Sequence, residues 1–144
     1  MDGLIVVNKP AGITSHDVVN KIRRIFNTKQ VGHLGTLDPL ATGVLVVALN
    51  KATKLVPYLE NVTKEYVVEA TIGLESDTFD SLGVITKRVK PTNITEEIID
   101  KTLESFLGVS EQTPPIYSAI KVNGKKLYEL AREGKIIERK PRDI

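Results

Sequence analysis

The sequence predicts an α+β fold, in which short strands and helices follow one another along a single domain. Three observations support this class: apolar runs of strand length, an amphipathic helical pattern after residue 14, and a second helical pattern after residue 93. Turn-forming Gly, Pro and Asn residues separate these segments. With 144 residues, the chain is long enough to bury a sizeable core.

The N-terminal part of the chain shows these local signals most clearly. The apolar run at 3–7 ends in the sequence Asn-Lys-Pro-Ala-Gly, which is typical of a strand followed by a turn. After it, Val18, Val19 and Ile22 recur at helical spacing. We next expect a helix from a Thr14 or Ser15 cap to about Phe26, with Ile25 and Phe26 also on its apolar face. The strand over 3–7 precedes it, and a loop over 27–43, a strand buried on both faces over 44–49 and a short helix over 54–61 follow it.

The rest of the chain adds one clear helix and several short strands. Asn93 begins the helix, with Glu96 three positions later as in a capping box, and Gly108 ends it. The apolar side of this helix is expected to be buried and consists of Ile94, Ile98, Ile99, Leu103, Phe106 and Leu107. Strands are also expected over 66–73 and 83–89, joined by an acidic loop, and over 109–113 and 117–122, around a Pro-Pro bend. A turn at Asn123-Gly124 and a helix over 126–133 follow.

Composition and charge limit the class of protein. Cysteine is absent, which excludes disulfides and thiolate metal sites, and His16 and His33 are too far apart in sequence to suggest a metal-binding pair. No apolar run approaches the ~20 residues of a membrane span and no secretory signal is visible, so a cytoplasmic protein is expected. The first 54 residues carry seven Lys or Arg against three Asp or Glu, residues 55–120 five against eleven, and residues 121–144 eight against four. The basic ends form either a phosphate-binding face or ordinary solvated surface.

A short segment around Asp38 is the most informative part of the sequence. Pro39 disfavours helical backbone at the residue before it, and the glycines at 35 and 43 permit conformations that side chains forbid. The segment is therefore expected to be a tightly shaped loop that presents one carboxylate. An ionised carboxylate can act as a nucleophile. Alternatively, Asp38 only forms an Asx turn before the proline.

Six segments in colinear order carry a resemblance to a known family. They are NKPAGITS at 8–15, GHLGTLDPLATGVL at 32–45, KEY at 64–66, DTFDSLG at 77–83, QTPPIYSAIK at 112–121 and KKLYELAREG at 125–134. The second segment resembles the catalytic motif of the TruB family of tRNA pseudouridine synthases, and the others resemble its companion motifs. The likeness extends over almost the whole chain.

This resemblance implies a fold, a reaction and a partner. The fold would be a mixed, mostly antiparallel sheet with helices packed on it. The reaction would isomerise uridine to pseudouridine in the TΨC loop of tRNA (position 55). Neither a cofactor nor a metal would be required, because no redox change or group transfer occurs. The partner would be the T-arm of tRNA, bound by a monomeric enzyme.

The resemblance also assigns roles to residues of this sequence. Asp38 would be the nucleophile, Tyr66 would stack on the extruded uracil, and His33 would fill space beside the flipped nucleotide. The further residues are Lys9 and Lys64, which would contact phosphate or orient the loop, Asp77 and Asp80, which would support the site, and Tyr117 and Lys121, which belong to an RNA-clamping arm over 112–134. Each also has an ordinary structural interpretation, such as a core tyrosine, a solvated lysine or a surface turn carboxylate.

Members of this family continue beyond the position of Ile144, through the rest of the catalytic domain and into a C-terminal RNA-binding domain. That continuation supplies an arginine that pairs with the catalytic aspartate and an apolar residue of the uracil pocket. We therefore expect residues 1–144 to be a partial catalytic domain that is weakly active or inactive when isolated. Two alternatives stay open, a non-catalytic RNA-binding fragment and the catalytic subunit of a guide-RNA-dependent, dyskerin-type particle.

Overall fold

The computed structural model describes residues 1–59, 63–116, 121–122, 124–127, 130, 133–134 and 138–144. These residues form helices and short antiparallel sheets, so the predicted α+β class is confirmed. The chain divides into two compact units, unit 1 over Met1–Val68 and unit 2 over Glu69–Ile144. No helix within the described ranges is long and apolar enough to cross a membrane.

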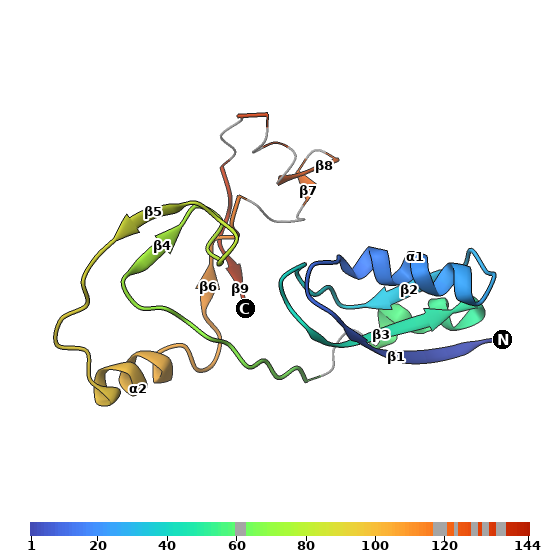
Figure 1. The fold of residues 1–144 in the computed structure, drawn as a ribbon, viewed down its shortest axis with the longest axis horizontal. Helices are drawn as coiled ribbons and strands as arrows, with labels where there is room; N and C mark the ends of the chain where they lie inside the picture. The colour runs from blue at the N-terminus through green and yellow to red at the C-terminus, as the bar shows by residue number, and fades with distance from the viewer. Residues whose placement is uncertain (60–62, 117–120, 123, 128–129, 131–132, 135–137) are drawn as a thin grey trace. The chain divides into compact units, whose positions relative to one another are not determined.

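Unit 1 is built on a three-stranded antiparallel sheet in the order β1-β3-β2 (Figure 1). The strands are β1 (Gly3–Lys9), β2 (Val31–Leu34) and β3 (Gly43–Leu49). Lys9 of β1 lies opposite Gly43 at one end of the central strand, and Gly3 lies opposite Leu49 at the other end. The strands predicted over 3–7 and 44–49 are therefore confirmed.

Strand β2 corrects the prediction of a continuous loop over 27–43. It pairs with β3, with Val31 opposite Leu49 and Leu34 opposite Val46. The sequence Val-Gly-His-Leu carries little local strand signal, because it is short, contains a glycine and shows no clear alternation. Its extended conformation instead follows from long-range pairing with an apolar strand.

Helix α1 (Ser15–Ile25) packs on one face of this sheet (Figure 1). The Thr14 hydroxyl accepts a hydrogen bond from the Asp17 amide (3.0 Å), and the Asp17 carboxylate accepts one from the Thr14 amide (2.9 Å), which together form a capping box. The Thr14 hydrogen bonds also hold the pKa of the Asp17 carboxyl below its ordinary value. The core between helix and sheet consists of Val18, Val19, Ile22, Val31, Leu45, Val47 and Leu49. The predicted cap and helix are confirmed.

Two predictions about burial in unit 1 are wrong. Ile25 and Phe26 are exposed at the end of α1, although their spacing predicts buried positions. Val44 is 71% exposed, so β3 is not buried on both faces along its whole length. Val6 is also exposed and lies on the same face of the sheet as Val44, the face opposite α1. A 3-10 helix, η1 (Asn50–Tyr58), follows β3 where the sequence predicts a short helix over 54–61.

Unit 2 begins with an antiparallel hairpin made of β4 (Leu74–Ser76) and β5 (Ile85–Arg88). Strand β5 confirms the strand predicted over 83–89, but the strand predicted over 66–73 is wrong. Residues 63–72 form neither strand nor helix, and they are exposed. A strand needs hydrogen-bonding partners for its backbone and a face to bury. The described part of the chain provides neither for this segment.

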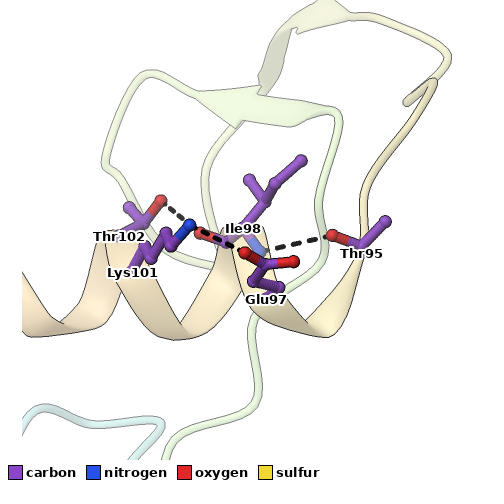
Figure 2. A network of polar contacts seen from close by, with 5 residues as sticks. All are labelled: Thr95, Glu97, Ile98, Lys101 and Thr102. Atoms are coloured by element: carbon purple, nitrogen blue, oxygen red, sulfur yellow. Dashed lines mark hydrogen bonds and ion pairs between the residues drawn. The ribbon is translucent and has the colours of Figure 1, made fainter.

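Helix α2 (Glu96–Glu104) confirms the predicted helix, but both of its ends differ from the prediction (Figure 2). It ends at Glu104, before Phe106, Leu107 and the predicted stop at Gly108. Thr95, and not Asn93, is the N-cap, because its hydroxyl accepts a hydrogen bond from the Ile98 amide (3.3 Å). The Lys101 ammonium pairs with the Glu97 carboxylate at 2.7 Å on the outer surface. The predicted burial of the apolar side is wrong: α2 contains no buried residue, and Leu103 is 62% exposed.

The C-terminal part of unit 2 contains two short ladders. Strand β6 (Glu111–Gln112) pairs with β9 (Arg142–Asp143), and β7 (Lys121–Val122) pairs with β8 (Lys125–Lys126). Gly124 lies in the turn between β7 and β8 at φ +83°, as the Asn-Gly signal predicts, whereas Asn123 lies outside the described residues. Leu127 and Leu130 are buried, but half of the residues in the helix predicted over 126–133 lie outside the described residues.

Candidate active site

The Asp38 loop connects β2 to β3 at one end of the unit 1 sheet. Asp38 itself is exposed, and its backbone carbonyl accepts a hydrogen bond from the Ala41 amide (3.0 Å) in a turn through Pro39. Gly35 at φ +75° and Gly43 at φ +120° begin and end the loop in conformations that favour glycine. The loop therefore presents its carboxylate to solvent, as the sequence predicts.

The residue after Asp38 is held by the turn that follows β1. The carbonyl oxygen of Pro39 accepts hydrogen bonds from the Gly12 amide (2.8 Å) and from the Lys9 ammonium (3.3 Å). Lys9 also donates to the carbonyls of Pro10 (3.0 Å) and Ile13 (2.8 Å), and its side chain is fully buried. Of the two roles expected for Lys9, the structure places it as an organiser of this loop.

The residue before Asp38 is held by the start of α1. The Ser15 hydroxyl donates to the Leu37 carbonyl (3.1 Å) and accepts from the Leu37 amide (2.9 Å). The Leu37 side chain packs against the core of unit 1. Segments 8–15 and 32–45 therefore meet in space, and Asp38 lies between two residues with fixed backbone. Sequence reasoning missed the individual role of Ser15, because the residue type and its place beside the helix cap give no sign of it.

His33 lies in β2, on the face of the sheet that packs against α1, where it pairs with Val47 of β3. Its Nδ1 contacts the carbonyl oxygen of Gly35, which can only accept a hydrogen bond. Nδ1 is therefore the donor in this contact. The histidine is therefore joined to the first residue of the Asp38 loop.

Tyr66 and Lys64 lie near the end of unit 1, in the segment without regular structure. The Tyr66 side chain is 64% exposed and Lys64 is also exposed, so neither is a core residue. No hydrogen bond joins either side chain to Asp38 within the residues that the structure describes. Their sequence-based assignment to the substrate site stays a prediction.

Asp80 and Asp77 organise the loop between β4 and β5. The Asp80 carboxylate accepts hydrogen bonds from the Thr78 hydroxyl (2.6 Å) and the Leu82 amide (2.9 Å), and Asp77 accepts from the Val84 amide (2.8 Å). The hydrogen bond from Thr78, and less strongly the backbone hydrogen bonds to the Asp80 carboxylate, hold the pKa of the Asp80 carboxyl below its ordinary value. A side chain at Gly83 would collide with the Thr78 hydroxyl and the Asp77 carboxylate. Both acids thus have the structural role of turn carboxylates.

The predicted RNA-clamping arm over 112–134 belongs to unit 2 and is only partly described. Tyr117 lies outside the described residues, and Lys121 is described only as a backbone position in β7. The base of the arm is closed by the pairing of β6 with β9 and by a hydrogen bond from the Arg139 guanidinium to the Pro114 carbonyl (3.0 Å). These contacts join the start of the arm, at 111–114, to residues 139–143, which follow the arm in sequence.

Ion pairs between side chains are described in unit 2 but not for the exposed cations in the described part of unit 1. In unit 2, Lys87 pairs with Glu75 at 3.0 Å and Lys101 pairs with Glu97. In the described part of unit 1, exposed cations form no such ion pair; these are Lys21, Arg24, Lys29, Lys51, Lys54 and Lys64. No group of three or more acidic or histidine side chains that could hold a metal ion occurs among the described residues.

Comparisons with known proteins agree with the sequence motifs. Residues 23–144 match the sequence model of the N-terminal domain of TruB family pseudouridylate synthases. A tRNA pseudouridine synthase B from Dehalococcoides mccartyi is 54% identical over 142 residues, covering 99% of this chain and 47% of that protein. Its counterpart from Oenococcus oeni is 52% identical over 147 residues, covering 99% of this chain and 48% of that protein.

A solved structure also has a similar fold. The crystal structure of a Cbf5-Nop10-Gar1 complex contains a chain that matches with a TM-score of 0.59 and 29% sequence identity. The match covers 98% of the present chain and 32% of that chain. The present chain spans about half the length of the curated relatives it matches.

Proposed function

Because the chain belongs to the TruB family of pseudouridylate synthases, we propose that it carries the catalytic aspartate of an enzyme that isomerises uridine to pseudouridine in tRNA. The target is the uridine of the TΨC loop (position 55), and the nucleophile is Asp38. The enzyme meets its substrate in the cytoplasm and acts as a monomer. This proposal combines the family, the names of its relatives and the geometry of the Asp38 loop.

The geometry of the Asp38 loop is the observation that carries this proposal. Its carboxylate is exposed, while the backbone on either side is held by Ser15, Gly12 and Lys9. A structural turn aspartate needs no such support, because an Asx turn is satisfied by its own neighbouring amides. A nucleophile does need it, since its rate depends on approach geometry.

The chemistry requires a nucleophile and no external reagent. The Asp38 carboxylate adds to an electrophilic carbon of the nucleotide, and this divides a difficult step into two easier ones. The bond between the sugar C1′ and uracil N1 breaks, and a bond between C1′ and uracil C5 forms. The bond between the Asp38 carboxylate and the nucleotide then breaks, which regenerates the free carboxylate. The C5 proton leaves to solvent and N1 gains a proton, so substrate and product are isomers. The balance therefore involves no cofactor.

The uridine must leave its stack before a side chain can reach it. We assign the exposed ring of Tyr66 to stacking on the extruded uracil, a contact worth ~1–3 kcal/mol. His33, joined to Gly35 at the start of the loop, occupies space beside the flipped nucleotide. We also assign a supporting role to Asp80, on the resemblance of segment 77–83 to a family motif; its carboxylate organises the β4–β5 loop.

The RNA backbone is bound by cations. Several exposed lysines of unit 1 have no ion-pair partner among the described residues, and such lysines are suited to phosphate contacts. One of them, Lys64, lies two positions before Tyr66 in the sequence. We assign a second set of contacts to the arm over 112–134, through Lys121 and Tyr117, because basic and aromatic residues together suit loops of RNA.

The substitution Asp38→Asn in the full-length natural protein tests the catalytic assignment. Turnover of a T-arm transcript should disappear, while RNA affinity stays within about tenfold, since binding depends on phosphate contacts and stacking elsewhere. Asp100→Asn makes the same chemical change at an exposed position of α2 and should leave both quantities unchanged. Equal loss of turnover and affinity in Asp38→Asn would mean that the loop is structural, and full turnover would refute the nucleophile.

A second candidate function follows from the similarity to the Cbf5-containing complex. In that case the chain would act in a guide-RNA-dependent particle and would need accessory proteins. The two functions differ in a direct assay: a stand-alone enzyme converts unmodified tRNA without other proteins or guide RNA. We favour the stand-alone enzyme, because the relatives near 50% identity are named tRNA pseudouridine synthase B.

A further inference from the structure

The Ser15 hydroxyl makes an unusual pair of contacts with the Asp38 loop. Through a single oxygen it donates to the Leu37 carbonyl (3.1 Å) and accepts from the Leu37 amide (2.9 Å), across 22 positions of sequence. Its side chain is 2% exposed. A hydroxyl is the smallest side-chain group that can donate and accept at once. Alanine at this position would therefore lose both contacts without relieving any crowding.

The Leu37 carbonyl belongs to the peptide unit that joins Leu37 to Asp38. Because this unit is planar, fixing its oxygen fixes the direction from which the chain enters Asp38. On the other side, the ring of Pro39 sets its own φ and restricts the backbone of Asp38. The Pro39 carbonyl is held in turn by Gly12 and Lys9. Asp38 thus keeps few free torsions apart from those of its side chain.

We propose that Ser15 is a positioning residue for Asp38: its hydroxyl fixes the peptide unit before the nucleophile and so sets the approach of the carboxylate to the nucleotide. This inference rests on the proposed function. Ser15 does not touch the substrate, so its contribution lies in the chemical step and not in RNA binding. A misplacement of about 1 Å can cost roughly a hundredfold in rate.

Thr14 provides a matched control for this proposal. It is the neighbouring residue, also carries a hydroxyl and also lies at the start of α1. Its hydroxyl exchanges hydrogen bonds with Asp17 only, at 2.6 Å and 3.0 Å, within the described contacts, and so serves the helix and not the loop. Thr14→Ala should lower the stability of α1 through the lost cap. Any loss of rate caused by a weakened α1 will therefore appear in Thr14→Ala as well.

The test compares Ser15→Ala, Ser15→Thr and Thr14→Ala in the full-length natural protein. Single-turnover rates and RNA affinity are measured on a T-arm transcript, at a temperature where all variants are folded. We expect Ser15→Ala to lower the rate by roughly tenfold to a hundredfold with RNA affinity within twofold. Ser15→Thr keeps the hydroxyl and should recover most of the rate. Thr14→Ala should stay within about twofold of the unsubstituted protein in both measurements.

The outcomes separate this inference from the proposed function. If Asp38→Asn is inactive while Ser15→Ala is fully active, the nucleophile stands and the positioning role is refuted. If Ser15→Ala and Thr14→Ala lose rate equally, Ser15 acts only through the stability of α1 and the positioning role is again refuted. If Asp38→Asn remains fully active, the proposed function itself fails.

Discussion

Lys9 stabilises unit 1 through backbone carbonyls rather than as a surface charge. Its ammonium group is fully buried and donates hydrogen bonds to Pro10, Ile13 and Pro39. A buried cation is tolerated only when such partners satisfy it. The three carbonyls belong to the turn after β1 and to the Asp38 loop, so a single side chain joins two segments about thirty residues apart.

We predict that Lys9→Met destabilises unit 1 by about 2 kcal/mol, because methionine has similar length but no donor for the carbonyls. Lys64→Met makes the same change at an exposed lysine of unit 1 and should alter stability by less than about 0.5 kcal/mol. Hydrogen exchange of the β3 amides in residues 1–144 measures both effects. Equal protection in the two variants would contradict the organising role of Lys9.

Local chemistry at single residues determined which parts of the site could be predicted. Asp38 was predictable as an exposed loop carboxylate because Pro39 and the flanking glycines act on their immediate neighbours. The burial of Lys9 was not predictable from composition, since lysine is usually solvated. The Ser15 contacts depend on a partner 22 positions away, and no local pattern reports such a pair.

For helices and strands, the sequence predictions were correct where the interacting residues are close in sequence and wrong where they are far apart. Helix α1 was predictable because its cap and its apolar spacing are both local. Strand β2 was missed and the strand over 66–73 was wrongly predicted, because pairing with a distant segment decides both cases. The apolar side of α2 shows the same limit: its periodicity predicted the helix, but not whether anything covers it.

The β4–β5 loop is predicted to lose stability in acid. Because hydrogen bonds from Thr78 and the loop amides lower the pKa of Asp80 in the folded state, its ionised form stabilises the loop above the ordinary Asp pKa of about 3.9. This contribution is lost as the pH falls through the lowered folded-state pKa. The Leu82 amide signal in NMR should therefore titrate with a midpoint below the ordinary value.

Two variants test the cause of this shift. Thr78→Val removes the hydroxyl donor and should move the Leu82 midpoint upward, toward the ordinary value. Thr86→Val is the matched change in β5, where the hydroxyl donates to the Glu75 carbonyl and not to Asp80, and it should leave the midpoint unchanged. An unshifted midpoint in Thr78→Val would show that another group controls the titration.

For the molecule as a whole, the two units differ in how they are stabilised. Unit 1 has a continuous core between α1 and the sheet, and Leu45, Val47 and Leu49 within it are at most 1% exposed. In unit 2, α2 contains no buried residue, and the buried residues described there are Pro114, Leu127 and Leu130. Since local stability follows apolar burial, unit 1 should be the more stable part of the chain.

Limited digestion of residues 1–144 with trypsin should reveal this difference. Lys64 lies in the exposed segment 63–72, which forms neither strand nor helix and can enter a protease site in extended form. We expect early cleavage after Lys64 and accumulation of an N-terminal fragment that ends there, because Lys21 and Arg24 are protected by the helical backbone of α1. Lys64→Gln should abolish this cut and leave the others unchanged.

Cleavage within α1 before cleavage at Lys64 would contradict the greater stability of unit 1. Mass spectrometry of the early fragments distinguishes the two results.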